Sequence, residues 1–182
     1  MADFHLAPTT RRPQAEREAI LASPGFGSNF SDHMVLIDWN PEHGWHDHRI
    51  VGYAPFTLDP ASAVFHYAQE AFEGLKAYAH EDGSIWRFRA DVNATRFQRS
   101  ARRLALPELS VDDFLTGIDR LVDVDRDWVP RGAEQSLYLR PFMFAHSAFL
   151  AVKPSTSVTY AVIASPSGAY FGGSGVQPVR IW

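Results

Sequence analysis

The fold of this 182-residue chain is decided by one segment, His66-Tyr67-Ala68-Gln69-Glu70-Ala71-Phe72-Glu73-Gly74-Leu75-Lys76-Ala77-Tyr78. It ends in a β-prone run, Leu75 to Tyr78, which Asp82-Gly83 joins to a second run, Ile85 to Phe88. An Asp-Gly pair favours the positive φ values of a hairpin turn. The segment therefore predicts a β-hairpin, with Glu73-Gly74 where its first strand begins. A glycine there permits close approach of another backbone or a ligand.

Two amphipathic helices are predicted after the hairpin. From Val92 on, Phe97, Ala101 and Leu104 recur at helical spacing until Pro107 ends the element. The opposite face of this helix carries Arg96, Arg99, Arg102 and Arg103.

The second helix begins after Ser110, which forms a capping-box pattern with Asp113. Its apolar stripe comprises Val111, Phe114, Leu115, Ile118, Leu121 and Val122. This is the clearest helical pattern in the chain.

Four more segments have the composition of strands. They are residues 33–39, followed by the turn signal Asn40-Pro41, and residues 49–56, 136–144 and 157–164. We therefore expect an α+β domain in which an antiparallel sheet carries two principal helices on one face.

The chain divides by composition into four parts. We expect a loose polar tail at 1–24 with a short helix-like piece, a small α+β domain at 25–167, a glycine-rich linker at 168–175, and the start of a further, truncated domain at 176–182.

Composition excludes several classes of function. A net charge of −4 argues against a nucleic-acid surface, and no apolar run approaches the roughly 20 residues that span a bilayer. The N-terminus lacks the pattern of a secretory signal, so we expect a soluble cytoplasmic protein. His43, His46 and His48 match no zinc signature; we expect a polar surface loop and no metal site.

Three arginine and tyrosine positions suggest anion binding. Arg96 could bind a phosphate through bidentate hydrogen bonds, although from spacing alone a solvated helix face is the simpler explanation. Tyr138 and Arg140 are two apart in a strand, so they share one face while Leu137 and Leu139 pack the other. Such a pair suits the binding of a substrate carboxylate. Alternatively, Arg140 is a structural arginine whose donors bind a backbone carbonyl or an acidic neighbour.

Taken in order, these motifs resemble the branched-chain amino-acid aminotransferases, which are fold-type-IV enzymes that use pyridoxal 5′-phosphate (PLP). Besides the opening segment, the matching motifs are Phe88-Arg89, Asn93-Ala94-Thr95-Arg96, Phe30-Ser31-Asp32-His33-Met34, Asp125-Arg126-Asp127-Trp128-Val129-Pro130, Ser136-Leu137-Tyr138-Leu139-Arg140-Pro141 and Gly168-Ala169-Tyr170-Phe171. The resemblance runs from about Phe26 to Trp182.

The resemblance implies a role for each candidate residue. Arg96 would bind the PLP phosphate, and Tyr138 with Arg140 would bind a substrate carboxylate. Residues Phe30, Phe72 and Tyr170 would line the aliphatic side-chain pocket, although without the resemblance ordinary core packing explains lone aromatics better. Tyr67, Leu150 and Val152 would enter the pocket of a neighbouring subunit. The substrates would be branched-chain amino acids and their 2-oxo acids, with 2-oxoglutarate, and the complete enzyme would be a homodimer.

Two features depart from the family pattern. The chain has two lysines, Lys76 and Lys153, and neither is a good candidate for the Schiff-base lysine, so we expect no activity from this chain alone. We expect Lys76 to face solvent. In the segment 146–152 the family's Glu-Pro pair and Leu-Gly-Val are replaced, with Ser147, Ala148 and Ala151 present instead.

Three other interpretations remain open. Within the same fold the chain could be a D-amino-acid aminotransferase or an aminodeoxychorismate lyase. From another class, it could be a catalytically silent remnant that only dimerises.

Overall fold

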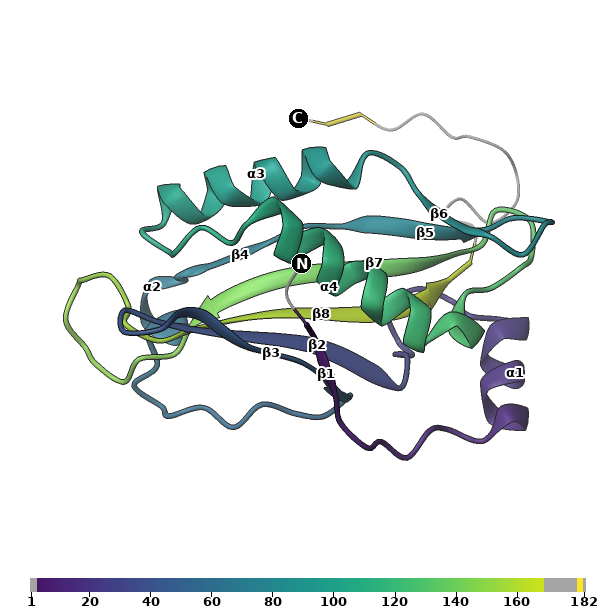
Figure 1. The fold of residues 1–182 in the computed structure, drawn as a ribbon, viewed down its shortest axis with the longest axis horizontal. Helices are drawn as coiled ribbons and strands as arrows, with labels where there is room; N and C mark the ends of the chain where they lie inside the picture. Colours follow the sequence, from purple (N-terminus) through teal and green to yellow (C-terminus); the bar gives the residue numbers. More distant parts are fainter. Residues whose placement is uncertain (1–2, 169–179, 182) are drawn as a thin grey trace.

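Eight strands of the described residues form one mixed sheet (Figure 1). The computed structural model describes residues 3–168 and 180–181. The strands are β1 His5–Leu6, β2 His33–Asn40, β3 Gly44–Gly52, β4 Glu70–Phe72, β5 Leu75–Ala79, β6 Ile85–Arg87, β7 Ser136–Ala145 and β8 Val158–Ser167. The helices are α1 Gln14–Ala22, α2 Ala63–Tyr67, α3 Ala90–Arg103, α4 Val111–Val124 and the 3₁₀ turn η1 Arg126–Trp128.

The strand order is β1-β3-β2-β8-β7-β5-β6, and β4 also pairs with β7. All pairs are antiparallel except β1 with β3, which are parallel. The expectation of a purely antiparallel sheet was therefore wrong at this edge. The α+β class and the central strands are confirmed.

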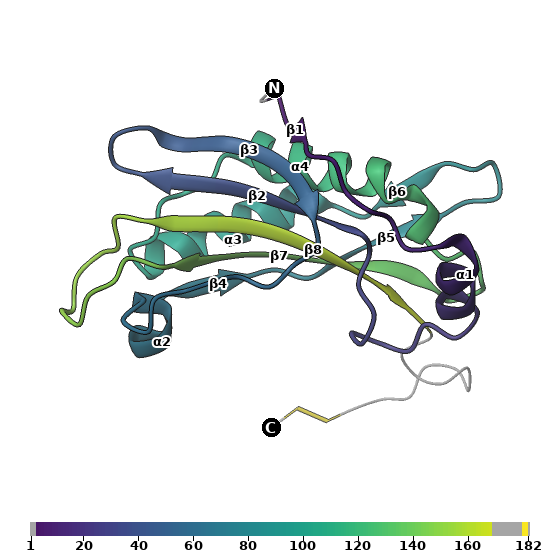
Figure 2. The same ribbon diagram turned by 90° about the horizontal axis from the view of Figure 1, so that it is seen from below.

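Helices α3 and α4 lie on the same face of the sheet, while α1 lies at one end of it (Figures 1 and 2). Their apolar stripes pack on the sheet residues that point toward them, including Val35, Leu137, Leu139 and Tyr160. The predicted N-cap is confirmed, because the Ser110 hydroxyl accepts the N–H of Asp113 at 2.9 Å. Most of the buried apolar residues belong to this one cluster, and their burial stabilises the domain.

The hairpin forms as predicted, with β5 and β6 joined through Gly83 at φ +83°. Strands β4 and β5 both pair with β7, and Glu73-Gly74 separates them. The break lies beside Pro141, which has no N–H to give to a neighbour; its carbonyl accepts the N–H of Glu73 at 2.8 Å. This interruption turns out to shape the candidate site.

Three sequence expectations need correction. The tail is not loose throughout, because Phe4 is buried in the core and His5–Leu6 pairs with β3. His46 and His48 lie in β3, not in a loop, because this strand spans Gly44–Gly52 and not the expected 49–56. Strand β8 continues past the expected end at Ala164 to Ser167. The expected linker after Gly168 and the expected strand at 176–182 lie outside the described residues, apart from Arg180 and Ile181.

No helix in residues 3–168 is both long enough and apolar enough to cross a membrane.

Candidate functional site

The sheet face opposite α3 and α4 carries the Tyr138 and Arg140 part of the candidate site. Tyr138 and Arg140 on β7 are half-buried there, while Leu137 and Leu139 are fully buried against the helices. This is the alternation that the strand period predicts. The Arg140 Nη2 donates to the Tyr138 hydroxyl at 2.9 Å, so the two side chains act as one unit.

Arg140 is a cation without a counter-ion in the described part of the chain. Its guanidinium lies over the ring of Phe72, 4.6 Å from the centroid, and 5.4 Å from that of Tyr138. Its Nε is buried and has no hydrogen-bond partner among the described residues. Leaving a buried charged donor unpaired is costly, so this geometry favours an anion as the missing partner.

A pocket of about 210 Å³ opens beside this pair. It is lined by Phe26, Gly27, Phe30, Tyr138, Arg140, Ile163, Ala164 and Ser165. Three residues predicted from the sequence, Phe30, Tyr138 and Arg140, therefore meet in one cavity. An apolar wall with one cationic group fits a ligand that has an aliphatic part and a carboxylate.

Phe26 is a pocket residue that sequence analysis missed. Its ring meets that of Tyr138 edge-on at 5.3 Å between centroids. Gly25 and Gly27 flank it with φ values of +62° and +71°, so the chain turns sharply on both sides. The pattern Gly25-Phe26-Gly27 was the signal in the sequence that could have indicated this turn and its aromatic side chain.

The Arg96 side chain is bound to a buried carboxylate. Its Nε and Nη2 donate to the two oxygens of Glu73, each at 2.6 Å, and Asn93 Nδ2 donates to Glu73 Oε2 at 2.8 Å. The hydrogen bonds to Glu73 and its charge raise the pKa of Arg96 above its ordinary value. Neither Glu73 nor Asn93 had been assigned a role from sequence, because partners 23 and 20 residues apart leave no periodic signal.

Gly74 is required by the neighbouring tyrosine. A Cβ at Gly74 would collide with the Tyr138 hydroxyl and would lie 3.1 Å from its Cζ. The close approach expected at this glycine is thus made by Tyr138.

A second pocket of about 280 Å³ lies on the other side of the phenol. It is lined by Gly74, Leu75, Lys76, Tyr78, Phe88, Asn93 and Tyr138. Lys76 is half-buried in this wall, which corrects the expectation that it faces solvent.

Three predicted residues lie away from the Arg140 pocket, near the end of β7. The Tyr67 hydroxyl donates to the carbonyl of Leu150, which ties α2 to the segment 146–152. The side chains of Leu150 and Val152 are exposed, at 69% and 88%. The structure therefore does not bring Tyr67, Leu150 or Val152 into the Arg140 pocket; Tyr67 and Val152 line a separate pocket of about 320 Å³. Tyr170 lies outside the described residues.

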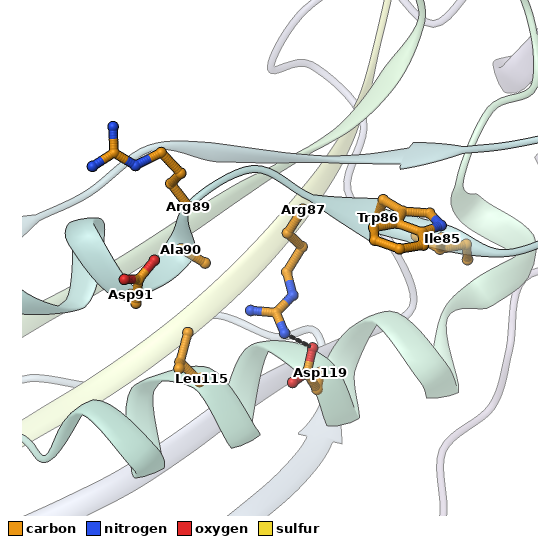
Figure 3. A pocket seen from close by; sticks show the side chains of 8 residues that line it. All are labelled: Ile85, Trp86, Arg87, Arg89, Ala90, Asp91, Leu115 and Asp119. Carbon is orange, nitrogen blue, oxygen red and sulfur yellow. Dashed lines mark ion pairs between the residues drawn. The ribbon is translucent and has the colours of Figure 1, made fainter.

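A further pocket, of about 380 Å³, lies between β6, the start of α3 and α4 (Figure 3). Arg87 points toward Asp119 and forms an ion pair with it, whereas Arg89 points away. Burial raises the pKa of Asp119, and Arg87 opposes this effect. None of its lining residues belongs to the Tyr138–Arg140 pocket, and both charges of the pair are already satisfied. Within residues 3–168, no three His, Cys, Asp or Glu side chains are placed to hold a metal ion.

Sequence comparison relates the chain to one family of enzymes. It is 58% identical over 169 residues to the probable branched-chain-amino-acid aminotransferase of Streptomyces coelicolor, covering 92% of this chain and 46% of the relative. The branched-chain-amino-acid aminotransferase of Mycolicibacterium smegmatis is 52% identical over 97% of this chain and 48% of its own length. The chain is related to the branched-chain-amino-acid aminotransferases. It spans about half the length of the curated relatives it matches. No protein-family model matches it.

Solved structures show the same fold. The Escherichia coli branched-chain amino acid aminotransferase superposes with a TM-score of 0.61, at 22% identity, over 80% of this chain and 43% of that one. The Thermobaculum terrenum enzyme, solved in its PLP form, superposes with a TM-score of 0.54, at 21% identity, over 72% of this chain and 39% of that one. The predicted fold-type-IV architecture is confirmed by this likeness.

Within the described part of the chain, Arg96 has free donors for a phosphate group, which would need further ligands besides Arg96. A guanidinium has five N–H donors, of which Glu73 uses two, and the Arg96 side chain is 60% exposed. The remaining donors suit an oxyanion. A single arginine whose charge is balanced by a carboxylate supplies only part of what a phosphate dianion needs.

Proposed function

We propose that this chain forms the small-domain side of a PLP-dependent branched-chain-amino-acid aminotransferase site. The single observation that carries the proposal is the Arg140 guanidinium, which has a buried Nε without a partner among the described residues and opens onto a largely apolar pocket. The names of the related proteins support the same reaction class.

Each part of the site would have a separate task. Arg96 would bind the phosphate of PLP, and PLP when bound would supply the carbonyl and the electron-withdrawing ring for amino-group transfer. Tyr138 and Arg140 would bind the second carboxylate of the dicarboxylic substrate, 2-oxoglutarate or glutamate. Phe30, Phe72 and Tyr170 would contact the aliphatic side chain of leucine, isoleucine or valine.

Tyr67, Leu150 and Val152 would serve a second subunit. Their distance from the Arg140 pocket and the exposure of Leu150 and Val152 support this assignment. We also propose that the complete enzyme is a cytoplasmic homodimer, in which residues 25–167 form the small domain and residues 168–175 connect it to a second domain. We expect no turnover from this chain alone, since neither Lys76 nor Lys153 matches the family's cofactor-binding lysine.

A chimera tests the proposal. The matched 177 residues of the Mycolicibacterium smegmatis relative would be replaced by the corresponding part of this chain, and leucine transamination with 2-oxoglutarate measured. We expect activity from the chimera and none from the 182-residue chain. Arg140→Ala should impair 2-oxoglutarate more than leucine, because leucine has no second carboxylate. A folded but inactive chimera would favour the silent-remnant interpretation.

A further inference from the structure

The Glu73 carboxylate is the most enclosed charge near the candidate site. Its side chain is 2% exposed, and it accepts three hydrogen bonds, two from Arg96 and one from Asn93. Both donors come from α3 and are three residues apart, so they lie on one face of the helix. The backbone of Glu73 is tied to Pro141, next to Arg140. One residue thus links α3 to β7 beside the pocket.

The pairing uses one particular edge of the guanidinium. Arg96 binds Glu73 through Nε and Nη2, which is the side-on edge of the planar group. The end-on fork, formed by Nη1 and the second Nη2 hydrogen, has no partner among the described residues. That fork has the geometry for bidentate contact with a second oxyanion.

We propose that Glu73 is a positioning residue, which holds Arg96 by its side-on edge so that the end-on fork is directed at the cofactor phosphate. This rests on the proposed cofactor role of Arg96. An unrestrained exposed arginine must be ordered when it binds, and its rotamer freedom is equivalent to about thirtyfold in an equilibrium constant. Glu73 has already fixed the side chain before the ligand arrives.

Charge and position predict opposite effects of removing the Glu73 carboxylate. A negative group beside a phosphate repels it, so by charge alone Glu73→Gln should tighten phosphate binding. If Glu73 positions Arg96, the same substitution should weaken phosphate binding, because glutamine keeps one acceptor oxygen but turns an NH2 group toward the other arginine donor, which loosens the two-point contact. The sign of the change therefore decides between the two roles.

The measurement is the preference of the 182-residue chain for pyridoxine 5′-phosphate over pyridoxine, as a ratio of dissociation constants from calorimetry. These probes lack an aldehyde and cannot react with Lys76 or Lys153. We expect Arg96→Ala to abolish the preference and Glu73→Gln to lower it about three- to thirtyfold. In the Arg96→Ala background, Glu73→Gln should have no further effect.

Glu108→Gln is the matched control. Glu108 holds Arg102 of the same helix through the same two donors, at 2.8 and 2.7 Å, and lies outside both pockets at the Tyr138 ring. It should leave the preference unchanged. Circular dichroism would show which variants fold, and if Glu73→Gln does not, Glu73→Asp, shorter by one methylene, should also lower the preference.

The outcomes separate the two proposals. If Arg96→Ala abolishes the preference while the folded Glu73 variants keep or increase it, the positioning role is overturned and the cofactor role stands. If the unsubstituted chain shows no preference, or Arg96→Ala does not change it, the cofactor role of Arg96 fails and the positioning role fails with it.

Discussion

The Asp125 carboxylate binds His33 twice, although the two residues are 92 positions apart. Its Oδ1 lies 2.6 Å from the ring Nδ1 of His33, and its Oδ2 accepts the backbone N–H of His33 at 3.0 Å. Both side chains are almost fully buried. Two motifs that identified the family from sequence, around His33 and around Asp125, therefore meet as a structural link between β2 and the end of α4.

We predict that Asp125→Ala lowers the free energy of unfolding by about 3–5 kcal/mol, because it leaves the His33 donors buried without a partner. Urea denaturation followed by circular dichroism would measure the change. Asp127→Ala is the control, because Asp127 is exposed and forms a surface ion pair with Arg17 at 3.5 Å. Its loss should lower the free energy of unfolding by less than about 1 kcal/mol. Equal costs for the two variants would contradict the structural role of the link.

A second prediction concerns the Tyr160 hydroxyl in the core. The ring packs against Phe97 and Phe114, and the hydroxyl is buried without a hydrogen-bond partner in the described part of the chain. Burial raises its pKa well above the ordinary value. Tyr160→Phe should therefore increase the free energy of unfolding by about 1 kcal/mol. Tyr53→Phe, on an exposed ring, should change nothing. A loss of stability in Tyr160→Phe would reveal a partner for the hydroxyl.

The third prediction is a pH dependence at His146. Thr159 donates its hydroxyl to Asp38 at 2.7 Å, so the His146 Nε2, 3.1 Å away, must carry a hydrogen and donate to Thr159. Burial lowers the pKa of His146 from its ordinary 6.5, and the charge of Asp38 opposes this. The unfolded chain then binds more protons than the folded one just below pH 6.5, so stability falls as the pH drops through 6.5.

The test compares unfolding free energies at about pH 7, 6 and 5, which bracket the titration of an ordinary histidine. His146→Gln should flatten the decline, while His43→Gln, at an exposed histidine, should leave it as it is. If the free energy of unfolding of His146→Gln declined just as steeply with falling pH, another titrating group would be responsible for the decline.

Regular patterns were enough to predict the elements but not their partners. The α4 stripe, the Asp82-Gly83 turn and the alternation of Tyr138 with Leu139 follow from short-range periodicity, and the structure has all three. The parallel β1 pair was missed because two residues carry no period. Sequence could not say which α3 arginine meets which carboxylate: Arg96 binds Glu73 before the helix, whereas Arg102 binds Glu108 after it. Such choices depend on how the helix is rotated over the sheet.

The last prediction concerns the contact between Gly74 and Tyr138. Since a Cβ at Gly74 would collide with the Tyr138 hydroxyl, Gly74→Ala should displace the phenol from the Arg140 Nη2 and lower the free energy of unfolding by about 1–3 kcal/mol. Tyr138→Phe removes the colliding oxygen, so the double variant should be less damaged than the sum of the single ones, with a coupling of about 1 kcal/mol. The remaining ring carbon, 3.1 Å from that Cβ, keeps the rescue partial. Urea denaturation of the unsubstituted chain, the two single variants and the double variant gives the coupling directly. Strictly additive losses would mean that the strand break at Glu73-Gly74 serves the backbone alone and does not make room for the tyrosine.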